Sequence, residues 1–310
     1  MTISSSYTYK KFISRNKNIS IIRNGLSENS INSVPGFTYA TNDINGPITT
    51  NKKSDDGTKS IINSLILQHV DKEEDDDTNK ERIAIVMYSN FVKSNSLAEH
   101  AISEFYQYAN IHNYKFLFYN QRYDKEREPF YMKIHALNEA IVYGLKEREY
   151  EWVMWIDNDV ILANPNIKLE TFLPKNKNIH FIAADRDGLN AGVFFLRVHS
   201  WSLNYLVSVL SYFYYNPDKV LKYPEEAALN NILIENKESK HYVIVPHHWF
   251  NTYPDKREKG DFLLHFCYRK LSGGDSKKIR NEIRNDPEYI SAKTNKNLRK
   301  EEIFILYEYN

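Results

Sequence analysis

The feature that most constrains the fold is a regular alternation of apolar runs and helical stretches that begins at Arg82. The run IAIVMY at 83–88 is continuously apolar, which is typical of a strand buried on both faces. The same reasoning predicts further strands at 114–119, 152–156, 180–184 and 192–198, and helices at 94–112, 129–147, 199–214 and 224–236. Such an alternation predicts an α/β fold with a Rossmann-like, mainly parallel sheet and helices on both faces.

The chain of 310 residues divides into three parts by composition. Residues 1–80 are rich in Ser, Asn, Thr, Lys and Asp and lead into the charged run DKEEDDDTNKER at 71–82, which predicts a partly ordered amino-terminal extension or stalk. Residues 81–275 carry the alternation of strands and helices and form the predicted main domain. Residues 276–310 are predicted to form a charged helical tail.

Charge and cysteine content limit the classes of protein to consider. A formal net charge of +1 gives no general attraction to nucleic acid or anionic lipid, so no nucleic-acid partner is expected. A single cysteine, Cys267, rules out an internal disulfide framework. No run of about 18 apolar residues occurs, which predicts no membrane-spanning segment in this chain. A Gly-rich phosphate loop of the Walker type is also missing, which argues against a kinase.

An acidic pair, Asp157 and Asp159, follows the apolar run VMWI. In open α/β sheets, ligands bind beyond the carboxyl ends of the strands. Two carboxylates one residue apart can share a divalent cation that keeps open positions for diphosphate oxygens. A solvated turn would also explain so short a pattern, but an acidic pair between two apolar segments is costly unless something compensates its charge. The pair is therefore a predicted metal site, ranked above Asp185-Arg186-Asp187, where the arginine can neutralise the acids.

The segment WVMWIDNDVILANPNIKLE at 152–170 resembles the signature of the glycosyltransferase family that holds fungal α-galactosyl- and α-mannosyltransferases and plant xyloglucan xylosyltransferases. Six further blocks are similar to that family in the same order: RIAIVMYS, SEFYQYANIHNYKF, FYMKIHALNEAI, DGLNAGVFFLRVHSWS, PEEAALNNIL, and FNTYP with GDFLLHF. The resemblance covers about 82–270. It implies a GT-A type fold, a nucleotide-sugar donor, Mn2+ or Mg2+ as cofactor, and retention of anomeric configuration.

The resemblance also implies a metal centre. Asp157 and Asp159 would hold the metal and the donor diphosphate, and His265 would complete the site from a distant part of the chain. A neutral imidazole is a suitable ligand for Mn2+ beside carboxylates. The alternative for His265 is an ordinary core histidine in the strand FLLHF.

Three residues are expected to contact the nucleotide part of the donor. Lys133 lies where the family keeps a lysine near the phosphates, although a solvated helix position would also suit it. Ser89 and Tyr88, at the end of the first strand, would approach the base, and Tyr88 could equally belong to the core.

Five residues are expected around the donor sugar and the leaving group. Asn190 would donate its amide to sugar hydroxyls or stabilise charge, and Gly192 would let the backbone approach a ligand closely. Glu225 and Glu226 would face the reacting carbon, with Glu225 preferred, although both also suit the first turn of a helix. The chain departs from the family after His265, where Lys270, or Arg269 before it, could still supply a cation to the leaving diphosphate.

The sequence thus predicts a metal-dependent retaining glycosyltransferase that moves a hexose or pentose to a glycan or other hydroxyl acceptor, with a UDP-sugar favoured over GDP-mannose. The alternatives are a glycogenin-like GT-A transferase and a catalytically weakened scaffold subunit. The oligomeric state, homo- or hetero-oligomer included, stays open. The resemblance implies the Golgi lumen if an anchor has been lost, and the cytoplasm otherwise.

Overall fold

A seven-stranded sheet forms the centre of the protein in the computed structural model, which describes residues 19–20, 82–185, 188–219, 223–267, 273–291 and 293–309. Its strands lie in the order β1-β3-β2-β4-β7-β6-β8. Their bounds are β1 Ile19–Ser20, β2 Ile83–Tyr88, β3 Lys115–Tyr119, β4 Trp152–Ile156, β6 Phe181–Asp185, β7 Leu189–Arg197 and β8 Tyr242–Val245. A separate antiparallel pair is made by β5 Val160–Leu162 and β9 Leu263–His265.

The sheet is mixed but mostly parallel. Strands β1, β3, β2 and β4 run parallel, and β8 runs parallel to β6. Strand β7 is antiparallel to both of its neighbours, β4 and β6. It follows β6 after only residues 186–188, and so short a connection cannot form the crossover that parallel strands need. The predicted α/β class is confirmed, and the reversed direction of β7 is a detail that the sequence pattern did not indicate.

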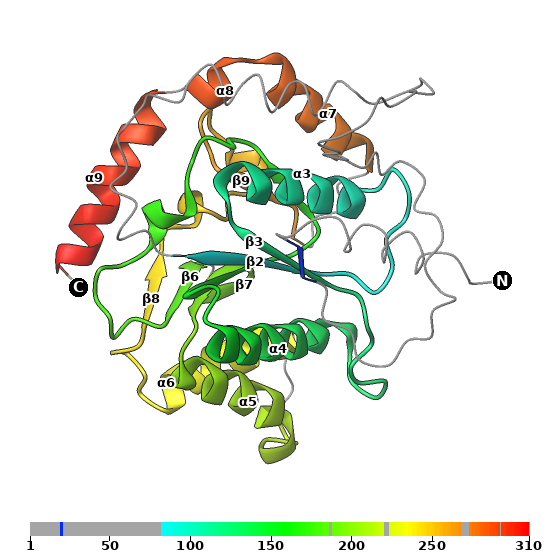
Figure 1. Ribbon diagram of the computed structural model, residues 1–310, viewed down its shortest axis with the longest axis vertical. Helices are drawn as coiled ribbons and strands as arrows, with labels where there is room; N and C mark the ends of the chain where they lie inside the picture. Colours follow the sequence, from blue (N-terminus) through cyan, green and yellow to red (C-terminus); the bar gives the residue numbers. More distant parts are fainter. Residues whose placement is uncertain are drawn as a thin grey trace.

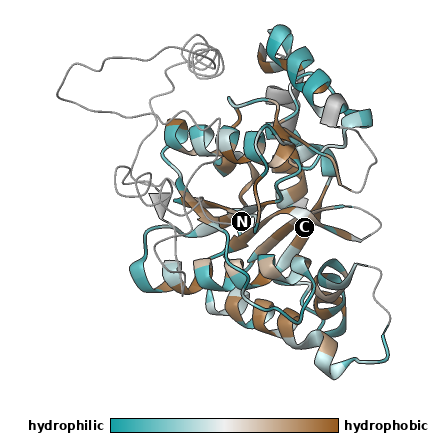
Figure 2. Cartoon of the chain, turned by 90° about the vertical axis from the view of Figure 1, so that its right-hand side faces the viewer, coloured by the Kyte–Doolittle hydropathy of each residue, from teal (hydrophilic) through white to brown (hydrophobic). Residues whose placement is uncertain are grey.

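Helices cover both faces of the sheet (Figure 1). Helix α3, Leu97–His112, lies on one face, and α4 Met132–Glu147, α5 Ser200–Tyr215 and α6 Pro224–Glu235 lie on the other. Side chains of β2 contribute to the hydrophobic clusters on both faces of the sheet: Ile85 packs in the cluster with α3, and Val86 packs in the cluster with α4. The apolar residues accordingly follow the central strands in Figure 2, and most of the hydrophilic residues lie on the helices and loops around them.

Local signals place the helix ends near the predicted positions. Ser96 caps α3 by accepting the Glu99 backbone N–H at 3.2 Å, so the helix begins after this residue rather than at 94. Pro129 opens a short 3-10 turn, η2 Pro129–Tyr131, that leads directly into α4. Three further 3-10 turns are η3 Leu169–Phe172, η4 His247–Trp249 and η5 Pro254–Lys256.

The carboxyl-terminal tail contains α7 Gly273–Asn285, α8 Glu288–Ser291 and α9 Lys293–Tyr309, which arch over the α3 side of the molecule (Figure 1). A buried ion pair ties α7 to α3, with Arg280 Nε 2.6 Å from Glu104 Oε1. At the far end of the tail, the Tyr307 hydroxyl donates to the Phe172 carbonyl at 2.7 Å. No helix in the described part of the chain is long and apolar enough to cross a membrane. Of the predicted extension 1–80, only Ile19–Ser20 is among the described residues.

The topology brings three distant segments together at one end of β4. The chain leaves β4 through Asp157 to Asp159 and enters β5, whose partner β9 ends at His265. Backbone hydrogen bonds fix this junction: Asp157 N–H donates to Gly192 O at 2.8 Å, and Phe266 N–H donates to Asp159 O at 2.9 Å. Strands β4, β7 and β9 therefore hold the acidic pair, the Gly192 segment and the histidine next to one another.

Candidate active site

A cavity of about 350 Å3 opens at this junction. It is lined by every site residue predicted from the sequence that the structure describes: Tyr88, Ser89, Lys133, Asp157, Asp159, Asn190, Gly192, Glu225, Glu226 and His265. Lys270, the expected cation for the leaving group, lies outside the described residues, as does Asp187 of the rival acidic motif. The remaining acid of that motif, Asp185, does not line the cavity.

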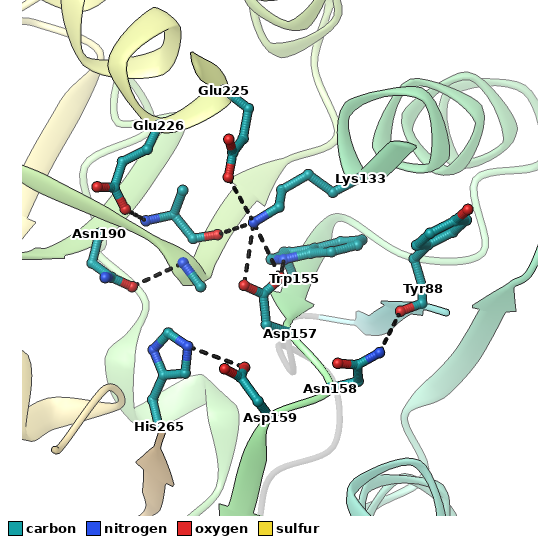
Figure 3. A network of polar contacts seen from close by, with 12 residues as sticks. Tyr88, Lys133, Trp155, Asp157, Asn158, Asp159, Asn190, Glu225, Glu226 and His265 are labelled. Carbon is teal, nitrogen blue, oxygen red and sulfur yellow. Dashed lines mark hydrogen bonds and ion pairs between the residues drawn. The ribbon is translucent and has the colours of Figure 1, made fainter. Parts of the chain in front are cut away.

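The acidic pair and the histidine converge on one point. One ligand atom from each of Asp157, Asp159 and His265 can be chosen so that the three lie within 4.8 Å of one another, a grouping found once among the described residues. His265 Nε2 lies 3.2 Å from Asp159 Oδ1 (Figure 3). The histidine is buried at 2% exposure, whereas the aspartates are partly open to the cavity. Two carboxylates and an imidazole are a suitable donor set for Mn2+.

The two aspartates differ in their electrostatics. Burial raises the pKa of Asp157, an effect that the neighbouring Lys133 opposes and the negative Asp159 reinforces. Burial also acts to raise the pKa of Asp159, but the charge and the hydrogen bond of His265 outweigh it and lower this pKa below its usual value. The two carboxylates therefore repel one another in a confined space, and an added cation would relieve that repulsion.

Lys133 is not a solvated helix residue but a buried cation at the floor of the site. Its Nζ lies 3.1 Å from Asp157 Oδ1 and 3.6 Å from Glu225 Oε1, and it donates to the Ala191 carbonyl at 2.9 Å (Figure 3). Burial alone would lower its pKa, but the carboxylates of Asp157 and Glu225 outweigh burial and raise it. The ammonium group therefore stays charged and links α4, the β4 end, β7 and α6.

The two glutamates at the start of α6 have different surroundings. Glu226 Oε2 accepts the backbone N–H of Ala191 at 3.1 Å and so holds the β7 backbone in place. Glu225 is 3% exposed and places one oxygen near Lys133. Its second oxygen, Oε2, is buried without a hydrogen-bond partner among the described residues. An unsatisfied carboxylate oxygen in a cavity wall is costly unless a ligand meets it, so Glu225 is the better candidate for contact with a substrate.

Asn190 and Gly192 are tied to the histidine. Asn190 Oδ1 accepts the Gly192 N–H at 2.8 Å and the amide of Asn251 at 2.9 Å, so any substrate contact of Asn190 would have to come from its amide nitrogen. A Cβ on Gly192 would lie 2.0 Å from His265 Cε1. A glycine at position 192 therefore leaves room for the imidazole ring of His265. This reason is different from the close approach to a ligand that the sequence led us to expect.

Sequence reasoning missed three residues that shape the site. Trp155 Nε1 donates to Asp157 Oδ1 at 2.8 Å, and Asn158 Nδ2 donates to the Tyr88 carbonyl at 3.3 Å. Asn251, which is fully buried, accepts at its Oδ1 from His265 Nδ1 at 2.8 Å. Trp155 lies two positions before the acidic pair and Asn158 lies within it, so both could have been noticed, while Asn251 had no signal beyond its place in the block FNTYP.

The expected base-binding end of the cavity also carries an unsatisfied group. Ser89 is buried, and its hydroxyl donates to the Phe91 carbonyl at 2.8 Å. The Tyr88 hydroxyl is buried without a partner among the described residues, and burial raises its pKa. Both residues line the cavity, which agrees with the expected position but does not by itself reveal what they bind.

The mostly parallel sheet with helices on both faces is a GT-A type fold. The crystal structure of a glycosyltransferase involved in the glycosylation of the major capsid of PBCV-1 is similar in fold, with a TM-score of 0.52 over 65% of this chain and 98% of that one. The sequence identity of that pair is 20%, so the likeness concerns the fold alone.

The chain belongs to the galactosyl transferase GMA12/MNN10 family, which its residues 79–183 and 172–271 match. This is the family indicated by the sequence blocks. Galactomannan galactosyltransferase 1 of Cyamopsis tetragonoloba is 27% identical over an alignment of 124 residues, and the match covers 36% of this chain and 28% of that protein. The alpha-1,2-galactosyltransferase of Schizosaccharomyces pombe is 26% identical over an alignment of 238 residues, and the match covers 60% of this chain and 61% of that protein. The chain therefore covers less than two thirds of the length of either relative.

Proposed function

We propose that this chain is a metal-dependent, retaining glycosyltransferase that transfers a hexose or pentose from a nucleotide-diphosphate sugar to a hydroxyl group of a glycan or other acceptor, forming an α-glycosidic bond. The observation that carries the proposal is the convergence of Asp157, Asp159 and His265 within 4.8 Å of one another in a cavity wall. We favour a UDP-sugar as donor, and the names of the two galactosyltransferase relatives make galactose the first sugar to test.

The donor set fits a divalent cation such as Mn2+, because two carboxylate oxygens and one imidazole nitrogen leave further coordination positions for diphosphate oxygens. When bound, such a cation would offset the negative charge that builds on the leaving nucleotide diphosphate. Asp157 and Asp159 would hold it from the β4 end, and His265 from β9. Lys133 would keep Asp157 ionised and oriented from below.

The remaining residues act on the sugar side. The Glu225 Oε2 atom, which has no hydrogen-bond partner in the described part of the chain, would meet a developing positive charge at the reacting carbon of the donor sugar or accept a hydrogen bond from a sugar hydroxyl. Lys133 fixes the other oxygen of the same carboxylate, which limits its rotation. Glu226 and Asn190 hold the β7 backbone at Ala191 and Gly192, which also line the cavity. Asn190 would add an amide donor toward the sugar only through its nitrogen.

Donor hydrolysis tests the proposal. The purified chain with Mn2+ should slowly release free sugar from one nucleotide sugar in a panel of UDP- and GDP-sugars, and that donor should raise the melting temperature because it binds only the folded state. Asp159→Ala should abolish the release. Asp185→Ala removes the exposed acid of the second Asp-x-Asp motif and should leave the rate unchanged.

The outcomes separate the proposed functions. Release of sugar from a UDP-sugar that Asp159→Ala abolishes supports the transferase. Binding of metal and nucleotide sugar without any release supports the weakened scaffold subunit instead. A chain that binds neither Mn2+ nor any nucleotide sugar would refute the metal-dependent transferase.

A further inference from the structure

A line of buried hydrogen bonds runs from the backbone of β7 to the metal-facing histidine. It begins at the Gly192 N–H, passes through the side-chain amides of Asn190 and Asn251, and ends at His265 Nδ1. The three side chains are 1%, 0% and 2% exposed in that order along the line. Water therefore does not compete for these bonds, and each donor must face an acceptor.

The first bond fixes the orientation of Asn190. A backbone N–H can only donate, so the Asn190 atom that lies 2.8 Å from Gly192 N must be the carbonyl oxygen. The same oxygen lies 2.9 Å from the amide of Asn251. Asn251 must donate there, because two oxygens without a hydrogen between them repel one another. Its NH2 group therefore faces Asn190.

The orientation of Asn251 then decides the protonation of the histidine. With its NH2 toward Asn190, Asn251 presents its carbonyl oxygen to His265 Nδ1 at 2.8 Å. An amide oxygen only accepts, so Nδ1 must carry a hydrogen. A neutral imidazole has a single N–H, which leaves a lone pair on Nε2, the nitrogen that lies 3.2 Å from Asp159 Oδ1. A lone pair and a carboxylate oxygen at this distance repel unless a proton or a metal cation lies between them.

We propose that Asn251, oriented by Asn190, is a positioning residue that fixes the Nδ1–H tautomer of His265 and so directs the Nε2 lone pair toward the metal. The inference deepens the proposed function, on which its metal-binding part rests. Partners of this kind orient ligating histidines in many metal sites, usually as carboxylates or backbone carbonyls. Here the orientation originates in a backbone N–H and is passed on by two amides.

Two substitutions at one position separate this role from a merely structural one. Asn251→Leu and Asn251→Asp both remove the hydrogen bond to Asn190, and both should cost stability. Only Asn251→Asp keeps an acceptor for His265 Nδ1–H. In Asn251→Leu the imidazole gains by moving its hydrogen to Nε2, where it donates to Asp159 and blocks the metal.

Mn2+ affinity, measured by electron paramagnetic resonance of the unbound ion, is the readout. Asn251→Leu should bind Mn2+ about 10- to 100-fold more weakly than the wild type, the usual effect of losing a partner of a ligating histidine, whereas Asn251→Asp should stay within about threefold. Thermal melts confirm that each variant is folded. An equal loss of Mn2+ affinity in both variants, or no loss of Mn2+ affinity in Asn251→Leu, would overturn the proposal.

A spectroscopic test needs neither metal nor activity. Long-range 1H–15N correlation spectra of the metal-free protein with 15N-labelled histidine distinguish Nδ1–H from Nε2–H, and His265→Gln assigns the signal. Nδ1 of His265 should carry a hydrogen, as its bond to the Asn251 carbonyl oxygen requires. A neutral Nε2–H tautomer in the wild type would refute the proposal that Asn251 fixes the Nδ1–H tautomer of His265. A confirmed Nδ1–H in a chain that binds no Mn2+ would refute the proposed metal site alone.

Discussion

Gly192→Ala tests the approach of β7 to the histidine most directly. The added Cβ would lie 2.0 Å from His265 Cε1 and 2.7 Å from both ring nitrogens, where carbon atoms in contact need about 3.5 Å or more. The ring must therefore move by about 1.5 Å, far beyond the ~0.2 Å tolerance of metal–ligand distances. We expect Mn2+ affinity to fall by at least about 100-fold, at or beyond the upper end of the effect of removing a partner from outside the coordination sphere.

Overpacking also costs the folded state about 1–3 kcal/mol, so stability must be followed separately. Gly144→Ala is a matched control, because its Cβ would lie 2.7 Å from Tyr150 Cε2 and 2.9 Å from Val198 Cγ1, in α4 and away from the cavity. This variant should keep the Mn2+ affinity of the wild type. Manganese titration followed by electron paramagnetic resonance and urea unfolding give the two readouts. A folded Gly192→Ala protein with wild-type Mn2+ affinity would show that His265 is not a ligand.

Three further predictions concern buried charges. Lys133→Met leaves the buried carboxylate of Glu225 and the partly exposed one of Asp157 without their shared cation. It should lower the free energy of unfolding by about 3–5 kcal/mol in urea titrations with EDTA; a loss under about 1 kcal/mol would contradict the buried pairing. Arg280→Met should cost about 3 kcal/mol by stranding buried Glu104, without changing Mn2+ affinity, and equal stability would show that the tail is not held by this pair. Burial and neighbouring positive charges lower the pKa of His180 to about 4. The neutral imidazole therefore stabilises the fold fully above pH 6.5, and the free energy of unfolding should fall by about 2–3 kcal/mol as the pH is lowered from 6.5 to 4. His180→Phe should flatten that part of the curve of stability against pH, and an unchanged slope would contradict it.

The fold was largely predictable because its strands are unusually apolar. The run at 83–88 is buried on both faces as expected. The strand predicted at 114–119 is β3, which begins one residue later, and the strand predicted at 152–156 is β4 with the same bounds. Strand β8 was missed although its four residues, YVIV, form an apolar run; three of them are only partly buried. The antiparallel direction of β7 depends on which strands it pairs with, and the apolar pattern of a strand carries no direction.

The candidate site was predictable as a set of residues but not as an arrangement. The acidic pair could be found from its place after a buried strand, and His265, Glu225 and Lys133 from the family blocks. The pattern of a helix cannot show that Lys133 is buried between two carboxylates, because those carboxylates come from β4 and α6. Whether their predicted roles in transfer are correct stays a matter for the hydrolysis experiment.

The acidic pair at the end of β4 illustrates the difference between what the sequence determined and what only the tertiary structure decided. The sequence by itself determined the strand, the carboxylates that follow it and the family to which the chain belongs, because these depend on neighbouring residues and on ordered blocks. Only the tertiary structure decided that Gly192 makes room for His265 and that Asn251 meets Asn190, which is 61 positions away in the chain. Hydrogen bonds of that span depend on how the strands pack against one another, and this packing is a property of the whole fold.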